Sequence, residues 1–215
     1  VASANDGASW SEIHARIERG TDGRLTIDFS GTSIRHPGNL NATPAIERSA
    51  ILYTMRLWTQ SPVPLNEGLL REVDVVLPPC FLNPAFSPDP TVCPAVVGGN
   101  VETSQRTVNL LIRLLGFQAR AQGTMNNLIF GNEGFGYYET IGGGAGAGPG
   151  HAGASGLHTH MTNTAITDPE ILERRYPVRL REFSLRRGSG GAGTWRGGDG
   201  LVREFEFLEP LRVSL

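Results

Sequence analysis

The sequence predicts an α+β fold in which mixed strands, two firm helices and glycine-rich loops share one chain. Three observations lead to this prediction. Apolar and polar residues alternate in several short stretches, which is the pattern of half-buried strands. Two segments carry apolar residues at the spacing of one helical face. Most of the 28 glycines lie between residues 131 and 200, where their density favours loops over helix interiors.

The strands are predicted from alternation and from the residues that end it. Apolar and polar residues alternate over 11–19 and over 25–29, and the intervening Gly20-Thr21-Asp22-Gly23 is a turn sequence, so we expect a β-hairpin there. A further strand is expected over residues 73–77, and the prolines that follow residue 77 stop it. The other expected strands cover residues 178–186 and 201–207.

The first helix is predicted from its start and stop signals. Thr43 is suited to cap a helix and Pro44 to begin it, and we expect the helix to end before Pro62. Thr167-Asp168-Pro169-Glu170 has the composition of another helix start.

The second helix has the clearest pattern in the chain. We expect Thr103 or Asn100 to cap it and Gly116 to end it. Its apolar positions at i, i+3, i+4 and i+7 are Val108, Leu111, Ile112 and Leu115.

Composition excludes several classes of protein. All 19 basic residues are arginine and the formal net charge is −2, so neither a lysine-dependent site nor a nucleic-acid-binding surface is predicted. No apolar run reaches the ~18 residues of a membrane span. Cys80 and Cys93 lack the spacing of a metal or redox motif, so we interpret them as reduced thiols of a cytoplasmic protein.

The segment GGGAGAGPG resembles a phosphate-binding loop, but such a loop runs from a strand directly into a helix. Here Pro149, Gly150 and His151 follow without helical periodicity. The sequence therefore favours a mobile or tightly packed glycine loop over a phosphate site.

His158 and His160 are the closest pair of histidines in the chain. In an extended segment they point to the same face, which permits shared metal ligation or general base catalysis. A third ligand would come from elsewhere, with Asp168, Glu170 and Glu139 as candidates. Structural or substrate-contacting roles for the two histidines stay open.

Two glutamates and several amides complete the candidate site. Glu102 and Glu139 lie in locally uncharged strings, where a desolvated carboxylate becomes suited to proton transfer, although surface or capping roles are equally open. Amide side chains match a cyclic amide or imide because both offer a donor and an acceptor, but Asn is also common in turns. The candidate substrate-binding residues are Asn100, Gln105, Asn126, Asn127 and Asn163.

Several strings together resemble the hydantoinase B/5-oxoprolinase family, in the same order and over nearly the whole chain. They include LNATPAIERSAILYTMR, PAVVGGNVETSQR, YYETIGGGAGAGPG, HTHMTNTAITDPEILERRYPV and FSLRRGSGGAGTWRGGDGLVREFEF. The resemblance implies that residues 1–215 form a single region of a hydantoinase B/oxoprolinase domain that is truncated at both ends. It does not transfer metal ligation to His158 or His160, so a metal site stays unassigned.

The activity that the resemblance implies is ATP-dependent hydrolysis of a C–N bond in a lactam or hydantoin ring, performed with a hydantoinase A-type partner. ATP and Mg²⁺ are expected in the full complex, with the nucleotide held by the partner and a further divalent metal possible. Alone, the fragment is expected to be inactive. Two alternatives stay open: a subunit of an acetone or acetophenone carboxylase-like enzyme, and a structural fragment without a site.

Overall fold

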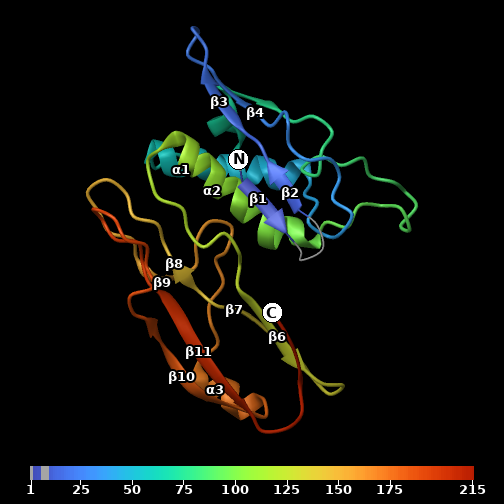
Figure 1. Cartoon of the computed structure of the whole chain (residues 1–215), viewed down its shortest axis with the longest axis vertical. Coiled ribbons are helices and arrows are strands. Elements are labelled where there is room, and N and C mark those ends of the chain that lie inside the picture. The colour runs from blue at the N-terminus through green and yellow to red at the C-terminus, as the bar shows by residue number, and fades with distance from the viewer. Residues whose placement is uncertain (1, 6–9) are drawn as a thin grey trace. The chain divides into compact units, whose positions relative to one another are not determined.

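The computed structural model describes residues 2–5 and 10–215, and it confirms the α+β fold class (Figure 1). Its backbone contacts divide the chain into two compact units, Val1–Thr124 and Met125–Leu215. Each unit has its own apolar core.

The first unit contains two small sheets. Strand β1 (Ala2–Asn5) pairs antiparallel with β2 (Trp10–Ile13). In the second sheet β4 (Leu25–Asp28) pairs antiparallel with β3 (Arg16–Arg19) and parallel with β5 (Val73–Val76). The predicted hairpin is confirmed for β3 and β4. The strand predicted over residues 73–77 is confirmed as β5. The expected single strand over 11–19 is wrong, because it is divided into β2 and β3.

A loop from farther along the chain accounts for this division. The backbone N–H of Ser33 donates to the carbonyl oxygen of Glu12 at 3.0 Å, and the N–H of Glu12 donates to Ser33 Oγ at 2.9 Å. The N–H of His14 donates to Thr32 Oγ1 at 3.1 Å. These hydrogen bonds occupy backbone groups of Glu12 and His14, at the point where strand pairing within the hairpin would otherwise continue.

Helix α1 (Pro44–Thr59) confirms the prediction at both ends. Thr43 Oγ1 accepts from the N–H of Ile46 at 3.3 Å, which satisfies one of the free amides of the first turn. The helix ends at Gln60, whose φ of 49° is left-handed, before Pro62. A short 3₁₀ helix, η1 (Glu67–Leu70), follows it.

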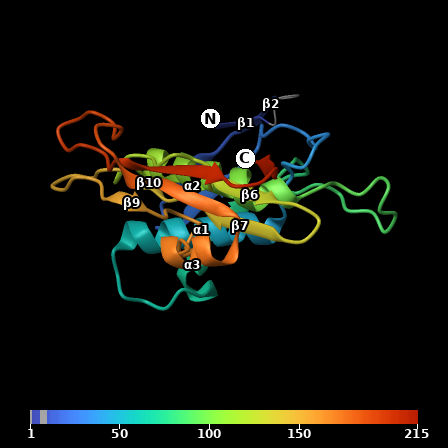
Figure 2. The ribbon, with the colours of Figure 1, turned by 90° about the horizontal axis from the view of Figure 1, so that it is seen from below.

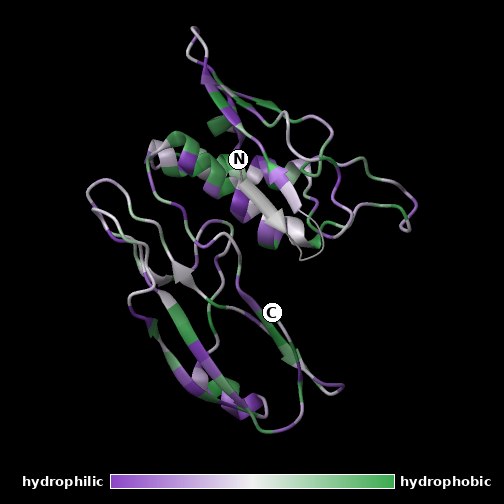
Figure 3. Cartoon of the chain, in the orientation of Figure 1, coloured by the Kyte–Doolittle hydropathy of each residue, from purple (hydrophilic) through white to green (hydrophobic). Residues whose placement is uncertain are grey.

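Helix α2 (Ser104–Leu115) ends at Gly116 as predicted, but its start is different. A π-helical turn, η2 (Gly99–Thr103), leads directly into it, so neither Thr103 nor Asn100 caps it. Thr103 is already helical, and its hydroxyl donates to the carbonyl oxygen of Leu40 at 2.6 Å. Hydrophobic and hydrophilic residues are interleaved along α2 (Figure 3), and most of its residues are buried.

The core of the first unit combines side chains of α1, α2, β2 and β4 with those of the neighbouring loops. A carboxyl group is buried with it, because Glu47 of α1 is 0% exposed. The large apolar side chains of this core include Ile13, Ile27, Phe29, Ile51, Phe81, Leu82, Leu110 and Leu111.

Replacing the buried carboxyl, Glu47→Gln, is expected to stabilise the protein increasingly as pH rises. Burial raises the pKa of Glu47 to about 8 from the ordinary 4.5, so folding costs free energy above pH 4.5, and the cost grows until pH 8. The isosteric amide carries no such cost. Urea unfolding should show a gain on the order of a few kcal/mol at pH 8 and a gain below about 1 kcal/mol at pH 5. An equal effect at both pH values would contradict this expectation.

The second unit contains two main antiparallel sheets. Strands β12 (Arg212–Ser214), β6 (Asn127–Gly131) and β7 (Gly136–Thr140) form one sheet in that order. The long strands β10 (Val178–Arg186) and β11 (Gly200–Phe207) form a second, confirming the predicted strands. The two strands run side by side for most of their length (Figures 1 and 2).

Helix α3 (Pro169–Arg175) begins where the sequence predicted a start. Asp168 Oδ1 accepts from the N–H groups of Glu170 and Ile171 at 2.9 and 3.3 Å. The helix buries Leu172 against the aromatic core of this unit. The other members of that core are Leu128, Phe130, Tyr137 and Val178.

The glycine blocks pack against one another, backbone to backbone. Strand β8 (Gly143–Gly144) pairs with β9 (Ser155–Leu157), and the N–H of Gly198 donates to the carbonyl oxygen of Ala145 at 2.9 Å. A Cβ on Gly144 would lie 1.9 Å from the carbonyl oxygen of Gly198, and a Cβ on Gly198 would lie 2.0 Å from that of Ala154. Tight packing therefore explains these glycines, and the alternative of a phosphate cradle finds no support.

The change Gly198→Ala is expected to destabilise the second unit by about 1–3 kcal/mol or more, because backbone atoms must shift to accept the methyl group. Gly191→Ala is the matched control in the same segment, since a Cβ there meets nothing within 4 Å. Urea unfolding of both variants tests the difference. Equal stability of the two variants would show that the glycines are not packed as described.

Within the described ranges, no helix combines the length and the apolar composition that crossing a membrane requires.

Candidate functional site

The Glu139 carboxylate forms a buried ion pair in the second unit. Its oxygens accept from Arg203 Nε at 2.7 Å and Arg203 Nη2 at 3.1 Å, and the Tyr137 hydroxyl donates to it at 2.5 Å. The side chains of Glu139 and Arg203 are 1% and 0% exposed. The guanidinium also donates to the carbonyl oxygen of Thr167 at 3.1 Å and lies 4.8 Å from the Phe183 ring centroid.

The expectation that both candidate glutamates lie in uncharged surroundings is wrong. Glu102 lies in η2 of the first unit, where Arg106 one turn later approaches it at 3.2 Å and the Thr124 hydroxyl donates to it. Each carboxylate is thus held by an arginine and a hydroxyl group. Such an arrangement orients the carboxylate firmly and occupies its oxygens.

The candidate amides have different environments. Asn127 Oδ1 accepts from the hydroxyls of Tyr138 and Thr140, both at 2.9 Å. Asn126 has a left-handed φ of 49°, and its Nδ2 donates to the carbonyl oxygen of Ile141 at 3.2 Å, so it serves a turn. Of the other three, Gln105 is buried in α2, whereas Asn100 and Asn163 are exposed.

His158 and His160 do not lie on one extended segment as expected. Strand β9 ends at Leu157, and His160 lies in a turn with a left-handed φ of 57°. Burial lowers the pKa of His158, and it lowers the pKa of His160 to about 4. Both imidazoles are therefore neutral near pH 7 and can accept a hydrogen bond, but a pKa of about 4 makes His160 a weak base for proton transfer.

His158 lines a cavity of about 240 Å³ in the second unit. The remaining lining residues supply two hydroxyl groups, two glycines and an apolar wall. Small apolar pockets with a few placed polar groups are typical of ligand sites. The lining comprises Gly142, Ser155, Gly156, His158, Thr164, Ile166, Phe183, Leu185 and Leu201.

Phe183 connects this cavity with the buried ion pair. Its ring lines the cavity, and the Arg203 guanidinium packs against it. Arg203 Nη1 is buried without a hydrogen-bond partner among the described residues. The cavity at His158 and the Glu139–Arg203 pair thus form one continuous group of side chains, which we call the His158 site.

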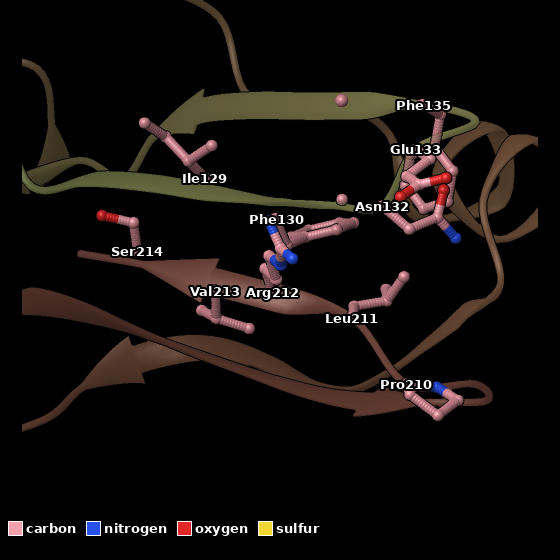
Figure 4. Close-up of a pocket in the computed structure, with 12 residues that line it drawn as sticks. Ile129, Phe130, Asn132, Glu133, Phe135, Pro210, Leu211, Arg212, Val213 and Ser214 are labelled. Atoms are coloured by element: carbon pink, nitrogen blue, oxygen red, sulfur yellow. The ribbon is translucent and has the colours of Figure 1, made fainter.

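A larger cavity of about 620 Å³ lies at the β6–β7 hairpin and β12 (Figure 4). Figure 4 shows Asn132, Glu133 and Phe135 gathered at the turn that joins the two hairpin strands, with Leu211 and Val213 along the neighbouring β12 segment. None of the nine candidate residues lines this cavity. Its larger volume therefore does not make it the site that the sequence motifs predict.

The described residues include no group of three or more His, Cys, Asp or Glu side chains placed to hold a metal ion. Asp168, one proposed third ligand, instead caps α3. Glu139, another, is occupied by Arg203. The packed glycine blocks also leave no strand–loop–helix cradle at GGGAGAGPG, where β8 is followed by a turn at Gly148–His151.

Sequence reasoning missed Arg203 and Tyr137. A signal for Arg203 was present, because Leu201, Arg203 and Phe205 alternate onto one face of the predicted strand. A charge on such an apolar face indicates a buried pair. Tyr137 and Glu139 share a strand face in the same way.

Comparisons with known proteins give one matching family and solved structures of similar fold. The sequence model of the family described as hydantoinase B/oxoprolinase matches residues 2–215. The 5-oxoprolinase of Dictyostelium discoideum is 47% identical over 98% of this chain, which spans 16% of that protein. The ATP-dependent caprolactamase of Pseudomonas jessenii superposes on 93% of this chain and 36% of its own, with a TM-score of 0.75 and 27% identity. An acetone carboxylase shares the fold, with a TM-score of 0.71 and 20% identity over 90% of this chain and 27% of its own.

Proposed function

Because the chain belongs to the hydantoinase B/oxoprolinase family, we propose that it is part of an ATP-dependent cyclic amidase that opens a lactam or hydantoin ring. The observation that supports this most directly is the joint similarity to a 5-oxoprolinase and to an ATP-dependent caprolactamase over nearly the whole chain. Both names describe lactam-ring chemistry. We propose 5-oxoproline as the first substrate to test.

We propose that the His158 site contacts the ring. The cavity of about 240 Å³ has the volume of roughly eight water molecules in the liquid, at ~30 Å³ each, and covalently bonded atoms pack more closely than separate water molecules, so a small lactam or hydantoin ring fits. The neutral imidazole would accept a proton or a hydrogen bond, and the apolar wall would hold the ring carbons. Glu139 would act as a positioning residue, because its oxygens already hold Arg203 and Tyr137.

The nucleotide is proposed to bind to a hydantoinase A-type partner. An amide carbonyl is a poor electrophile, and phosphorylating its oxygen with ATP would create a good leaving group for attack by water. This chain lacks lysine, and its glycine blocks are filled by their own backbone contacts. We expect Mg²⁺ to accompany ATP there, and the two free cysteines agree with a cytoplasmic complex.

A carboxylase-like role is the second candidate, and the shared fold of the acetone carboxylase is the observation that favours it. Formation of its product would require bicarbonate, whereas ATP-dependent ring opening consumes water and needs no bicarbonate. A structural role without a site predicts that changes at the His158 site alter assembly and nothing else.

Activity of the 215-residue chain alone tests the need for a partner. Incubation with ATP and 5-oxoproline or hydantoin should release no phosphate above background. Addition of a co-expressed A-type partner with the complete B-type subunit should produce ATP-dependent turnover. Turnover by the purified chain alone would contradict the proposed division of labour.

A further inference from the structure

A second cavity, of about 300 Å³, lies in the first unit and has a buried carboxyl group in its lining. Glu47 is 0% exposed, and neither of its oxygens has a hydrogen-bond partner in the described part of the chain. Pro44 and Arg48 of α1, which also line the cavity, are both exposed. The remaining lining consists of Val75, Leu77 and Asn83.

The groups around Glu47 do not neutralise it. The Thr107 hydroxyl of α2 lies near the carboxyl and favours the ionised form, but it completes no hydrogen bond of normal geometry, and burial outweighs its effect on the pKa. The Cys80 thiol is near enough for the carboxylate to raise the pKa of the thiol, an effect secondary to burial of that thiol. Arg48 is already paired with Glu67 of η1, its Nε donating to both carboxylate oxygens at 2.7 and 2.8 Å.

An unpaired buried carboxyl is costly, so its persistence beside an open cavity points to a ligand that supplies donors. An anion would meet the carboxyl unfavourably. A divalent metal would need several further oxygen or nitrogen ligands, and the described residues place no group of three or more His, Cys, Asp or Glu side chains to hold one. The apolar side chains of Pro44, Val75 and Leu77 suit a short aliphatic body.

We propose that this cavity, which we call the Glu47 cavity, binds a small aliphatic primary ammonium ion whose N–H groups donate to the Glu47 carboxylate. The alkyl chain would pack against Val75 and Leu77. At roughly 30 Å³ per heavy atom, a ligand of up to about ten heavy atoms fits. This inference does not depend on the proposed ring-opening activity, because the Glu47 cavity belongs to the other unit.

Titration of the 215-residue chain with n-butylammonium chloride at pH 7 tests the proposal. The Glu47 carboxyl is protonated at this pH, given its pKa of about 8, and binding of a cation would ionise it. The binding heat should therefore differ between phosphate and Tris buffers by nearly one released proton per ligand. Tetramethylammonium, which carries the charge without N–H donors, should bind at least tenfold more weakly.

Two variants and one control distinguish the outcomes. Glu47→Gln keeps the side-chain shape and should abolish both binding and proton release, and Val75→Phe should block binding by filling the cavity while leaving Glu47 in place. Glu18→Gln, at an exposed position, should behave as the unchanged protein. Absence of butylammonium binding, or equal binding by Glu47→Gln, would overturn the proposal.

Discussion

Replacing His158 with alanine should lower kcat of the complete enzyme complex by about 10²–10⁴-fold, the usual scale for removing an acid–base or orienting group. The expectation follows from its place in the cavity of about 240 Å³, beside two hydroxyls and opposite an apolar wall. Burial lowers the pKa of the imidazole, so the neutral form that accepts a proton dominates at neutral pH.

His160→Ala is expected to lower turnover as well, whereas the exposed His151 of the same unit provides the control. Melting temperature and kcat should be measured on the same preparations. A lower melting temperature with unchanged kcat in the surviving protein would show that the two histidines are structural. A loss of turnover in His151→Ala of equal size would also contradict a specific role for His158.

Removing the Arg203 side chain should have the largest effect on stability, about 3–5 kcal/mol, because Arg203→Met leaves the Glu139 carboxylate buried without its counter-ion. The packing of the guanidinium against Phe183 and Phe205, at 4.8 and 5.3 Å from their centroids, is lost with it. The double variant Arg203→Met, Glu139→Leu should recover much of the loss, since no isolated charge stays buried.

Arg181→Met is the matched control on the adjacent strand. Arg181 pairs with Glu206 as well, but their side chains are 48% and 40% exposed, so its loss should cost at most about 1 kcal/mol. Urea unfolding of all variants at neutral pH measures the difference. Equal losses for Arg203→Met and Arg181→Met would show that the buried pair contributes no more than a surface one.

The elements that the sequence predicted well depend on local signals. The Thr43 cap, Pro44 and the stop before Pro62 all act within one turn of α1, and the Asp168 cap does the same for α3. The start of α2 was missed because Thr103 donates to a carbonyl oxygen 63 residues away, at Leu40, instead of capping its own helix. Spacing within one segment cannot reveal such a partner.

The same limit applies to the candidate site. Glu139 looked uncharged in its own string because Arg203 is 64 residues later in the chain. The glycine blocks were visible as composition, but their packing against each other depends on close approaches such as Gly144 to Gly198. The expected shared face of His158 and His160 was wrong because β9 ends before them. The sequence did predict His158 as a candidate site residue, and the structure places it at a cavity.

The most direct test of the proposed activity is the product formed from 5-oxoproline by the complete B-type subunit together with the proposed A-type partner. With ATP and Mg²⁺ and without bicarbonate, we expect the ring-opened amino acid glutamate to accumulate in proportion to the phosphate released. The His158→Ala complex should form it at least about 100-fold more slowly. Product formation that requires bicarbonate, or undiminished ring opening by the His158→Ala complex, would contradict the proposed cyclic amidase and its site.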